Sequence, residues 1–313
     1  MDKFVYYLNE NTDPFFNQAF EEYLFLKETE KNILLLWRNE PCVVCGSYQN
    51  IFAEVSVDDC NQRGIKIVRR PSGGGTVYHD LGNINYTIIT SCDAKNVQYA
   101  PLIEPLVKAL NSIGIPASLN RLSDIAIDGI KVSGSAQKIL KNRVLHHGTL
   151  LFDCDLSVLR AVANGQRECF ETKGTKSFPW PVTNMREYLP ELSTEEFLCK
   201  LAEAMKRLYE VEEATISPEE IREIERLKEE KYLSWDWTYG KSPKFVFTKS
   251  VIIGGKAAKV RYEAQKGVIT DFSLTPFIGI ETDKMAGVRL EPTELKKICT
   301  TVFGDAYFYR NLI

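Results

Sequence analysis

The chain has 313 residues, of which 44% are apolar and 26% are charged, and its formal net charge is -3. This composition can build one large core with a smaller satellite domain, and the slightly acidic balance gives no general attraction to nucleic acid. No apolar run reaches the length of a membrane span, and the N-terminus lacks the basic start and long apolar core of a signal peptide. We therefore expect a soluble, cytoplasmic protein that binds neither nucleic acid nor membrane.

Eight cysteines are scattered along the chain without the regular spacing of a disulfide scaffold, which favours a reducing compartment. Cys42 and Cys45 form a lone C-x-x-C inside an apolar run, and no second pair follows at zinc-finger spacing. We interpret them as buried strand residues and assign no metal site.

Apolar runs in the N-terminal third alternate between strand and helix periods. Two β-rich runs, 33–37 and 42–46, flank a turn signal at 39–41 and predict a β-hairpin. The other elements expected here are a strand over 4–8, a helix beginning near Pro14, a helix over 56–63 closed by Gly64, and strands over 65–68 and 84–90.

A glycine-rich segment joins the last two of these strands. Three consecutive glycines, 73–75, follow Arg69 and Arg70. Glycines let backbone N–H groups approach a ligand, and arginine matches phosphate or carboxylate. The segment fits neither the Walker pattern nor the spaced glycines of a dinucleotide fold, and glycine-rich turns without a ligand are common. The two arginines nevertheless favour an anion-binding loop.

A second candidate site lies on the hairpin that Asp128-Gly129 predicts. Lys131 alternates with apolar neighbours, so on a strand its side chain points to the opposite face from theirs. An isolated strand lysine is ordinarily solvated, but the small residues at 133–136 leave room for a ligand beside this one. The pattern therefore favours a lysine in a binding site.

In the rest of the chain the sequence pattern indicates the type of each element but gives its bounds only approximately. His146 and His147 lie on a strand expected over 144–152, point to opposite faces and are not expected to share a metal. Helices are expected over 99–113 and 293–302, capping boxes at Ser193 and Ser217 open two charged helices, and the run 219–231 is interpreted as a solvated helical connector. Short β-runs over 246–253, 258–263 and 268–274 indicate a small α+β domain that begins after Pro243.

An arginine-flanked glycine loop and a lysine beside small residues suit one type of chemistry in particular. When a carboxylate attacks the α-phosphate of a nucleotide, the protein has to neutralise the oxygens of pentavalent phosphorus and hold both reactants in line. Lysine and backbone amides are suited to that task.

At this point the chain resembles the lipoate–protein ligases of the biotin/lipoate ligase superfamily. The matching motifs occur in the family's order: Asp13-Pro14-x-x-Asn17-x-Ala19-x-Glu21-Glu22, Arg69-Arg70-x-Ser72-Gly-Gly-Gly75-x-Val77-Tyr78-His79-Asp80, Lys131-Val-Ser133-Gly134 and His147-Gly148-Thr149-Leu150. The resemblance implies an α+β fold, with a large mixed-sheet catalytic domain over 1–243 and a small α+β accessory domain over 244–313.

The resemblance also implies a two-step reaction. Lipoate and ATP, accompanied by Mg²⁺, give lipoyl-adenylate and pyrophosphate, and a lysine of an apo lipoyl domain then attacks the adenylate. The acceptors implied are the E2 subunits of 2-oxoacid dehydrogenases and the H protein of the glycine cleavage system, and the enzyme is expected to be a monomer.

Roles at the site follow from the same resemblance. Lys131 is expected to bridge the lipoate carbonyl and the α-phosphate, and we hypothesise that Asp124 orients or deprotonates the incoming lysine amine. The residues expected to hold ATP or the adenylate are Arg70, Gly75, Thr76, Val77, Tyr78, Lys131 and Thr149. The residues expected to hold lipoate are Ser72, Gly73, Gly74, His79, Lys131, Gly134 and His147.

Two alternative functions stay open. The segment 177–184, Ser-Phe-Pro-Trp-Pro-Val-Thr-Asn, contains no arginine and looks more like a lipoyltransferase that accepts preformed lipoyl-adenylate. A transferase that passes the acyl group through a cysteine thioester is disfavoured. Superfamily members that do so have the cysteine shortly before the lysine motif, and here no cysteine lies between Cys92 and Cys154. A non-catalytic lipoate sensor is the other alternative, although it has little need for a lysine at the reaction centre.

Overall fold

A large mixed sheet forms the centre of the fold in the computed structural model, which describes residues 3–121, 123–163, 166–178, 180–276 and 279–313. The strand order is β12-β1-β2-β6-β10-β9-β8-β7. β1 pairs in parallel with β2 and β12, and all other neighbours are antiparallel. The strands are β1 (Lys3–Asn9), β2 (Asn32–Trp37), β6 (Asn83–Ser91), β7 (Ser118–Asn120), β8 (Asp124–Ile127), β9 (Ile130–Leu140), β10 (Arg143–Leu151) and β12 (Glu210–Glu213). The expected α+β fold with a large mixed sheet is confirmed.

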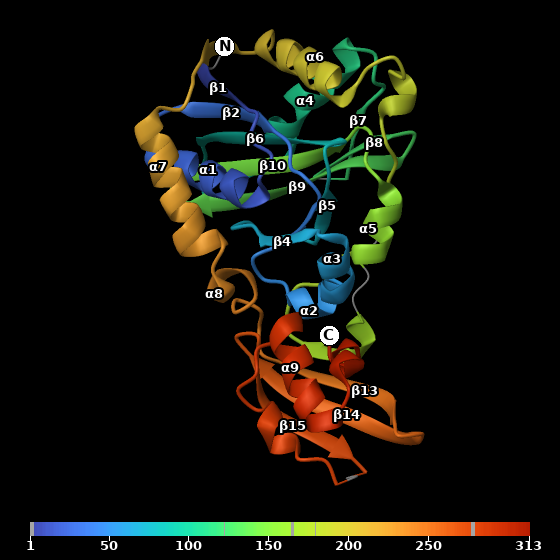
Figure 1. The fold of residues 1–313 in the computed structure, drawn as a ribbon. Coiled ribbons are helices and arrows are strands. Elements are labelled where there is room, and N and C mark those ends of the chain that lie inside the picture. Colours follow the sequence, from blue (N-terminus) through green and yellow to red (C-terminus); the bar gives the residue numbers. More distant parts are fainter. Residues whose placement is uncertain (1–2, 122, 164–165, 179, 277–278) are drawn as a thin grey trace.

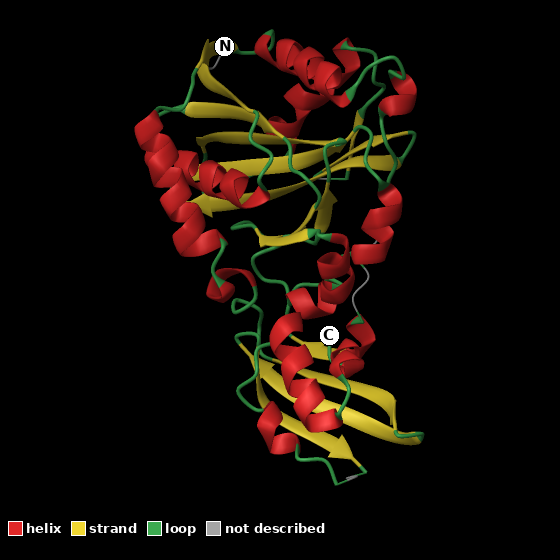
Figure 2. Ribbon diagram, in the orientation of Figure 1, coloured by secondary structure: helices red, strands yellow, loops and turns green. Residues whose placement is uncertain are grey.

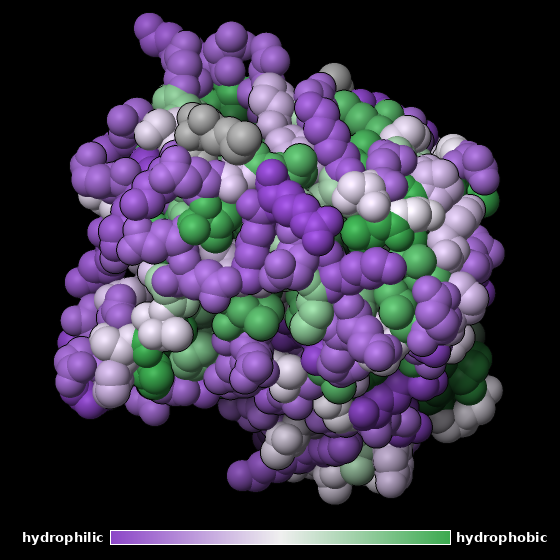
Figure 3. All heavy atoms as spheres, turned by 90° about the horizontal axis from the view of Figure 1, so that it is seen from above, coloured by the Kyte–Doolittle hydropathy of each residue, from purple (hydrophilic) through white to green (hydrophobic). Residues whose placement is uncertain are grey.

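One face of this sheet is closed by helices. Because side chains alternate along a strand, Leu34, Tyr86 and Leu150 point to the same side and pack against helices α4 (Ala100–Ser112) and α6 (Thr194–Lys206). Figure 2 shows these helices on one side of the strands. Viewed from the side of α6, the surface is mostly hydrophilic, with small hydrophobic groups between polar side chains (Figure 3). This layer therefore separates the sheet from solvent.

The opposite face is covered by two different elements. Helix α1 (Pro14–Lys27) packs on one part of it, and a small sheet of order β4-β3-β5 lies across from the rest (Figure 1). Its strands are β3 (Cys42–Cys45), β4 (Lys66–Arg69) and β5 (Val77–His79). Both cysteines of β3 are fully buried, which confirms the interpretation of the C-x-x-C.

The hairpin predicted for 33–37 and 42–46 is wrong. β2 is bonded to β1 on one edge and to β6 on the other, so neither edge is free to pair with β3. The turn between them instead carries the chain from the main sheet to the small sheet. A turn signal between two β-rich runs shows where the chain changes direction, but it does not show which strands share a ladder.

The C-terminal part forms a third sheet, of order β11-β13-β14-β15, packed against helix α9 (Pro292–Phe303). Its strands are β11 (Phe170–Thr172), β13 (Phe245–Ile253), β14 (Lys256–Gln265) and β15 (Val268–Thr275). The strands and the helix expected in this region are confirmed. β11 comes from the segment before residue 243, while the domain division at 243 stays a prediction.

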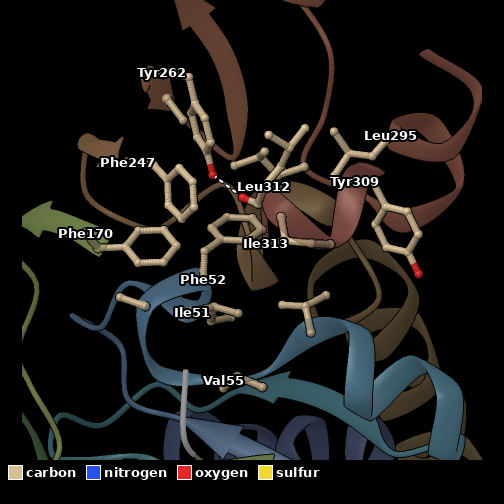
Figure 4. Packing of buried hydrophobic residues seen from close by; sticks show 14 of the residues in the cluster. Ile51, Phe52, Val55, Phe170, Phe247, Tyr262, Leu295, Tyr309, Leu312 and Ile313 are labelled. Atoms are coloured by element: carbon tan, nitrogen blue, oxygen red, sulfur yellow. Dashed lines mark hydrogen bonds between the residues drawn. The ribbon is translucent and has the colours of Figure 1, made fainter. Parts of the chain in front are cut away.

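A shared hydrophobic cluster joins the C-terminal sheet to the rest of the chain. Ile51 and Phe52, on helix α2 (Ile51–Glu54), pack with Phe247 and Ile313 in this cluster (Figure 4). The Tyr262 hydroxyl donates to the Leu312 carbonyl at 2.5 Å and holds the chain end there. Burial of these aromatic and aliphatic groups favours contact between the two parts.

Several local predictions are confirmed. Gly64 ends α3 (Val57–Arg63) in the left-handed conformation with φ 66°, and the capping boxes at Ser193 and Ser217 are both formed. The remaining helices and single turns are α5 (Leu156–Val162), α7 (Pro218–Leu227), α8 (Trp235–Thr238), Arg167–Cys169, Arg186–Tyr188, Lys228–Tyr232, Thr282–Met285 and Ala306–Asn311. None of the helices in the described part of the chain is long and apolar enough to cross a membrane.

The prediction that 219–231 is a solvated connector is wrong at its C-terminal end. Helix α7 ends at Leu227, and Lys231 pairs with the buried carboxylate of Glu22 on α1. The Tyr232 hydroxyl donates to the same carboxylate at 2.8 Å. A charged residue within a mostly exposed run can therefore pair with a buried acid that is distant in sequence.

Candidate functional site

A cavity of about 420 Å³ lies between the main sheet and the small sheet, and the glycine loop and the segment around residue 177 complete its wall. Four cationic side chains line it, Arg70, Arg121, Lys131 and Lys176, whereas Asp124 is the one carboxylate among its described lining residues. A cavity with such a surplus of positive charge attracts anions. It is therefore suited to a phosphate or carboxylate ligand.

Strand register places residues distant in sequence in one row across the cavity face of the main sheet. Asn85 lies opposite Trp37 on one side and opposite Thr149 on the other. The Gly134 amide donates to Thr149 Oγ1 at 3.3 Å, and Asp124 lies opposite Gly134. The row crosses β2, β6, β10, β9 and β8, a distance of about 19 Å at a strand spacing of about 4.8 Å. It provides one continuous wall for an elongated ligand.

Lys131 lies at one end of this row. Its Nζ donates to Asp124 Oδ1 at 2.8 Å, and the two side chains are 24% and 12% exposed. A Cβ atom at Gly134 would lie 2.9 Å from both Cε and Nζ of Lys131. The small residues after Lys131 were expected to leave room for a ligand, and Gly134 in fact leaves room for the lysine side chain itself.

Arg70 lines the cavity but directs most of its N–H groups at the glycine loop. Its Nη2 donates to the carbonyls of Gly73 at 2.6 Å and Gly75 at 2.7 Å. Its Nη1 donates to the Val44 carbonyl at 3.0 Å, and its Nε to Ser72 Oγ at 3.0 Å. Burial lowers the pKa of Arg70 to about 10, so it stays charged at neutral pH. Arg70 therefore fixes the shape of the loop as well as its charge.

Arg69 has a different role from its neighbour. It is fully buried, and its Nη1 donates to the carbonyls of Gly46 at 2.8 Å and Gln49 at 2.9 Å. Its Nε donates to the Thr238 carbonyl at 2.8 Å, and its Nη2 to Ser242 Oγ at 3.1 Å. The sequence suggested that both arginines supply charge to a ligand, but Arg69 is a structural brace behind the cavity.

A buried chain of polar groups supports the wall opposite the small sheet. His147 Nε2 lies 2.7 Å from Ser72 Oγ, and its Nδ1 lies 2.8 Å from Glu21 Oε1. The Thr87 hydroxyl donates to the same carboxylate oxygen at 2.6 Å. His147 reaches the cavity, while Ser72 and Glu21 lie behind it. The chain holds the imidazole in one orientation at the cavity surface.

Most of the predicted site residues are brought together in this cavity. Those that line it are Arg70, Gly74, Gly75, Thr76, Val77, His79, Asp124, Lys131, Gly134, His147 and Thr149. Ser72, Gly73 and Tyr78 do not. Alternation along β5 explains Tyr78, whose side chain lies in the hydrophobic core, whereas Val77 and His79 face the cavity.

A segment that we call the strap, residues 175–178 and 180–183, extends along the cavity from the glycine loop to β9. At one end Ser177 Oγ accepts from the Thr76 amide at 2.8 Å. At the other end the Thr183 amide donates to the Lys131 carbonyl at 3.0 Å. Between them the Trp180 ring lies 3.4 Å from the Arg121 guanidinium. Pro179, which belongs to the segment 177–184 quoted from the sequence, lies outside the described residues.

Several cavity residues are missing from the sequence-based prediction. Arg121 belongs to the same short segment as Asp124, so its position beside a predicted site residue was an available signal. Trp37 and Asn85 could be found only by knowing the register of β2, β6 and β10. Lys176 and Trp180 lie on the strap, which has no periodic pattern.

Comparison with known proteins gives a consistent result. The family model for the lipoyl protein ligase A/B catalytic domain matches residues 13–206. The chain is 33% identical over 303 residues to a probable lipoate-protein ligase A of Mycoplasma pneumoniae, with 95% of this chain and 86% of that protein covered. It is 36% identical over 270 residues to the lipoate-protein ligase LplJ of Bacillus subtilis, with 84% and 82% covered.

Solved structures agree with these relatives. A putative lipoate protein ligase of T. acidophilum with bound lipoic acid superposes with a TM-score of 0.64 at 26% identity, covering 77% of this chain and 99% of that one. A chain from the structure of a bi-partite lipoate protein ligase and its E2 lipoyl domain from Thermoplasma acidophilum gives 0.65 at 25%, with 77% and 96% covered. A lipoate-protein ligase A bound with ATP gives 0.62 at 25%, with 77% and 99% covered. The chain therefore belongs to the lipoate–protein ligase family.

Proposed function

We propose that this chain is an ATP-dependent, AMP-forming lipoate–protein ligase, which activates lipoate as lipoyl-adenylate and transfers the lipoyl group to a lysine of a lipoyl domain. The observation that carries the proposal is the Lys131–Asp124 pair, held at one end of a cationic cavity opposite a braced glycine loop. Relatives of similar length are named for this activity, and solved structures of similar fold contain lipoic acid or ATP.

In the first step, a carboxylate oxygen of lipoate attacks the α-phosphorus of ATP and pyrophosphate leaves. Negative charge accumulates on the phosphorus oxygens, and we assign its neutralisation to the Lys131 ammonium. Arg70 adds a second positive charge whose position is already fixed by its bonds to the loop carbonyls. Charges fixed in advance lower the barrier because they need no reorganisation during the reaction.

In the second step, the acceptor lysine amine attacks the acyl carbonyl, the carbon–oxygen bond to AMP breaks, and the amine loses a proton. Asp124 is the carboxylate that lines the cavity beside Lys131. We assign to it the orientation or deprotonation of the incoming amine, while Lys131 stabilises the departing phosphate. Both roles use atoms that already share a hydrogen bond of 2.8 Å.

The nucleotide side of the cavity is expected at the strap. Lys176, which lies on the strap, and Arg121 line the cavity there and bring positive charge that the segment 177–184 lacks. The described residues include no group of three or more His, Cys, Asp or Glu side chains able to hold a metal ion. Mg²⁺ therefore fits best as an ion that enters with the ATP phosphates, which supply most of its oxygen ligands.

A lipoyltransferase that accepts only preformed lipoyl-adenylate is the second candidate. The observation in its favour is the strap, which presents Phe178 and Trp180 to the cavity in place of arginine. Their rings stack with centroids 5.0 Å apart, and Phe178 is 74% exposed. Such a strap suits the flat base of an adenylate without requiring that pyrophosphate be expelled.

One experiment separates these functions. The full chain is incubated with lipoate, Mg-ATP and an apo lipoyl domain, and intact mass of the lipoyl domain is measured; a parallel reaction receives preformed lipoyl-adenylate. Modification in both reactions supports the ligase, and modification in the second alone supports the transferase. Failure of both, with lipoate binding retained, indicates a sensor.

The acceptors that we propose are the lipoyl domains of 2-oxoacid dehydrogenase E2 subunits and the H protein of the glycine cleavage system. We propose that the enzyme works as a monomer in the cytoplasm, where all eight of its cysteines, which are free thiols, stay reduced. Light scattering after size-exclusion chromatography tests the monomer, and parallel mass assays with both acceptor classes test the partners.

A further inference from the structure

The inner wall of the cavity contains buried polar atoms that have no hydrogen-bond partner. They are Gln18 Oε1, His79 Nε2 and Asn85 Nδ2, and all three residues line the cavity. Each of these residues is at most 3% exposed. Buried polar groups are nearly always paired in folded proteins, because an unpaired one loses its bonds to water without replacement. Their gathering in one cavity therefore points to a bound group that satisfies at least the two donors among them, His79 Nε2 and Asn85 Nδ2.

The hydrogen-bond network identifies His79 Nε2 as a donor. His79 Nδ1 lies 2.9 Å from Asn39 Nδ2, and Asn39 Oδ1 already accepts from Asn17 Nδ2 at 2.8 Å. Asn17 Nδ2 also donates to the backbone carbonyl of Asn11 at 2.8 Å, which fixes the orientation of both amides. Asn39 thus donates to Nδ1, and the proton of the neutral imidazole is on Nε2. Burial lowers the pKa of His79 to about 3 and keeps the ring neutral.

Asn85 supplies a second unpaired donor on the same wall. Its Oδ1 accepts from Asn83 Nδ2 at 2.9 Å, so its own Nδ2 remains free. Asn85 lies two strands away from Gly134 on β9, against which the Lys131 ammonium packs, and two strands are separated by about 10 Å at the usual spacing. That separation is comparable to the length of a medium-chain acid whose carboxylate is held at Lys131.

Trp37 lies at the inner end of the cavity, the end opposite Lys131 and Asp124. It lies opposite Asn85 in the register of β2 and β6, and its ring is 6.4 Å from the His79 ring in an edge-on arrangement. Helix α1, which carries Gln18, packs against Trp37 in the same hydrophobic cluster. The inner end therefore combines an aromatic surface with two N–H donors and one carbonyl acceptor.

We propose that Gln18, His79 and Asn85 form a polar recess that makes the site selective for an acyl chain ending in a dithiolane ring over a plain alkyl chain. This inference rests on the proposed function. Ring sulfurs are weak hydrogen-bond acceptors and make favourable contacts with aromatic rings. An alkyl end of similar size leaves both donors buried and unpaired, and sites built on polar groups reject analogues that cannot pair with them.

The test compares lipoate with octanoate in the full chain and in the variants Asn85→Leu and His79→Phe. The first readout is the ratio of kcat/KM values for the two acids with Mg-ATP and an apo lipoyl domain. The second is the ratio of calorimetric Kd values for the lipoyl and octanoyl sulfamoyl-adenosine analogues, which requires no catalysis. Because each ratio is taken within one protein sample, the folded fraction of a variant cancels.

We expect the natural chain to favour the lipoyl member by at least about tenfold in both ratios. Asn85→Leu and His79→Phe should bring the ratios toward one, mainly through a gain for the octanoyl member. His146→Phe is the matched control: His146 is buried on the other face of β10, and its two ring nitrogens lie 3.2 Å from Gln137 Nε2 and 3.4 Å from the Tyr86 hydroxyl. This control should keep the natural ratio.

Equal ratios in the natural chain, or ratios that both recess variants leave unchanged, would overturn the inference and indicate that water satisfies these atoms. The proposed function can fail separately. If neither acid is transferred but the lipoyl analogue still binds more tightly in the natural chain and loses that advantage in the variants, the recess stands and the ligase assignment falls.

Discussion

The two faces of the main sheet are built from the same strands but differ in how their polar groups are paired. His146 and His147 are neighbours on β10 and point to opposite faces. His146 packs edge-on against Tyr99 under the helical layer, whereas His147 joins Glu21 and Ser72 at the cavity. The helical face is closed by apolar contacts, and the cavity face keeps cations and unpaired donors in its wall. Because side chains alternate along each strand, neighbouring residues serve different purposes. One packs in the core and stabilises the fold, and the next lines the cavity.

The largest effect is expected from Lys131→Met on the cavity face. The substitution keeps much of the volume but removes the charge that pairs with Asp124, so ligation should fall by about 10²–10³-fold while the melting temperature changes little. The measurement is the rate of lipoyl-domain mass increase. Lys256→Met, on an exposed position of β14, should ligate normally. Near-normal turnover of the Lys131 variant would remove this residue from the mechanism.

The second-largest effect is expected from Gly46→Ala, a substitution behind the cavity face. A Cβ atom at Gly46 would lie 2.2 Å from the Gly74 carbonyl oxygen, so the glycine loop has to move. We expect a loss of about 1–3 kcal/mol in the free energy of unfolding, measured by urea denaturation. Gly73→Ala is the control for stability, because its Cβ would have no neighbour closer than 3.8 Å. Equal stability of the two variants would show that the loop is not tightly packed.

His146 on the helical face should contribute to the response to acid. Burial lowers the pKa of His146 to about 3, so at pH 5 the folded chain keeps this ring neutral while the unfolded chain protonates it near its ordinary value of about 6.5. Stability therefore falls as the pH drops below about 6.5, by about 2 kcal/mol for this ring between pH 7 and pH 5. Between pH 7 and pH 5, the free energy of unfolding of His146→Phe, measured by urea denaturation, should therefore fall by about 2 kcal/mol less than that of the natural chain. An identical pH dependence in the two proteins would contradict the assignment.

The smallest effect is expected at the edge of the helical layer. Ser193→Ala removes the side-chain oxygen that accepts from the Glu196 amide at 3.2 Å at the start of α6. The free energy of unfolding should fall by about 1 kcal/mol, with ligation unchanged. Ser250→Ala, on an exposed position of β13, should change neither. A loss of ligation in the Ser193 variant would show that the two faces are not independent.

Local signals in the sequence predicted their elements well, because they depend on neighbouring residues. The Asp128-Gly129 pair predicted a tight hairpin, and both residues have positive φ, 50° and 79°. That hairpin brings Asp124 and Lys131 together within seven positions of sequence. Since the turn geometry fixes both strands, this half of the site could be derived from a short segment.

The rest of the site depends on contacts that no local pattern specifies. Arg69 and Arg70 are identical residues in adjacent positions, yet alternation at the end of β4 turns one into the core and the other toward the cavity. Trp37 and Asn85 become neighbours only through the register of β2 and β6. The strap is positioned by hydrogen bonds with residues distant in sequence, among them Gln49, Thr76 and Lys131. Such positions are decided by packing between layers.

The brace formed by Arg69 restricts how the C-terminal part could swing relative to the cavity. One fully buried guanidinium binds the Gly46 and Gln49 carbonyls on one side and the Thr238 carbonyl and Ser242 hydroxyl on the other. Separating these groups would leave a buried charge without partners, which is strongly unfavourable. Residues 238–242 are therefore tied through Arg69 to the segment 46–49, and we expect any hinge between the cavity and the strands that follow to lie after Ser242.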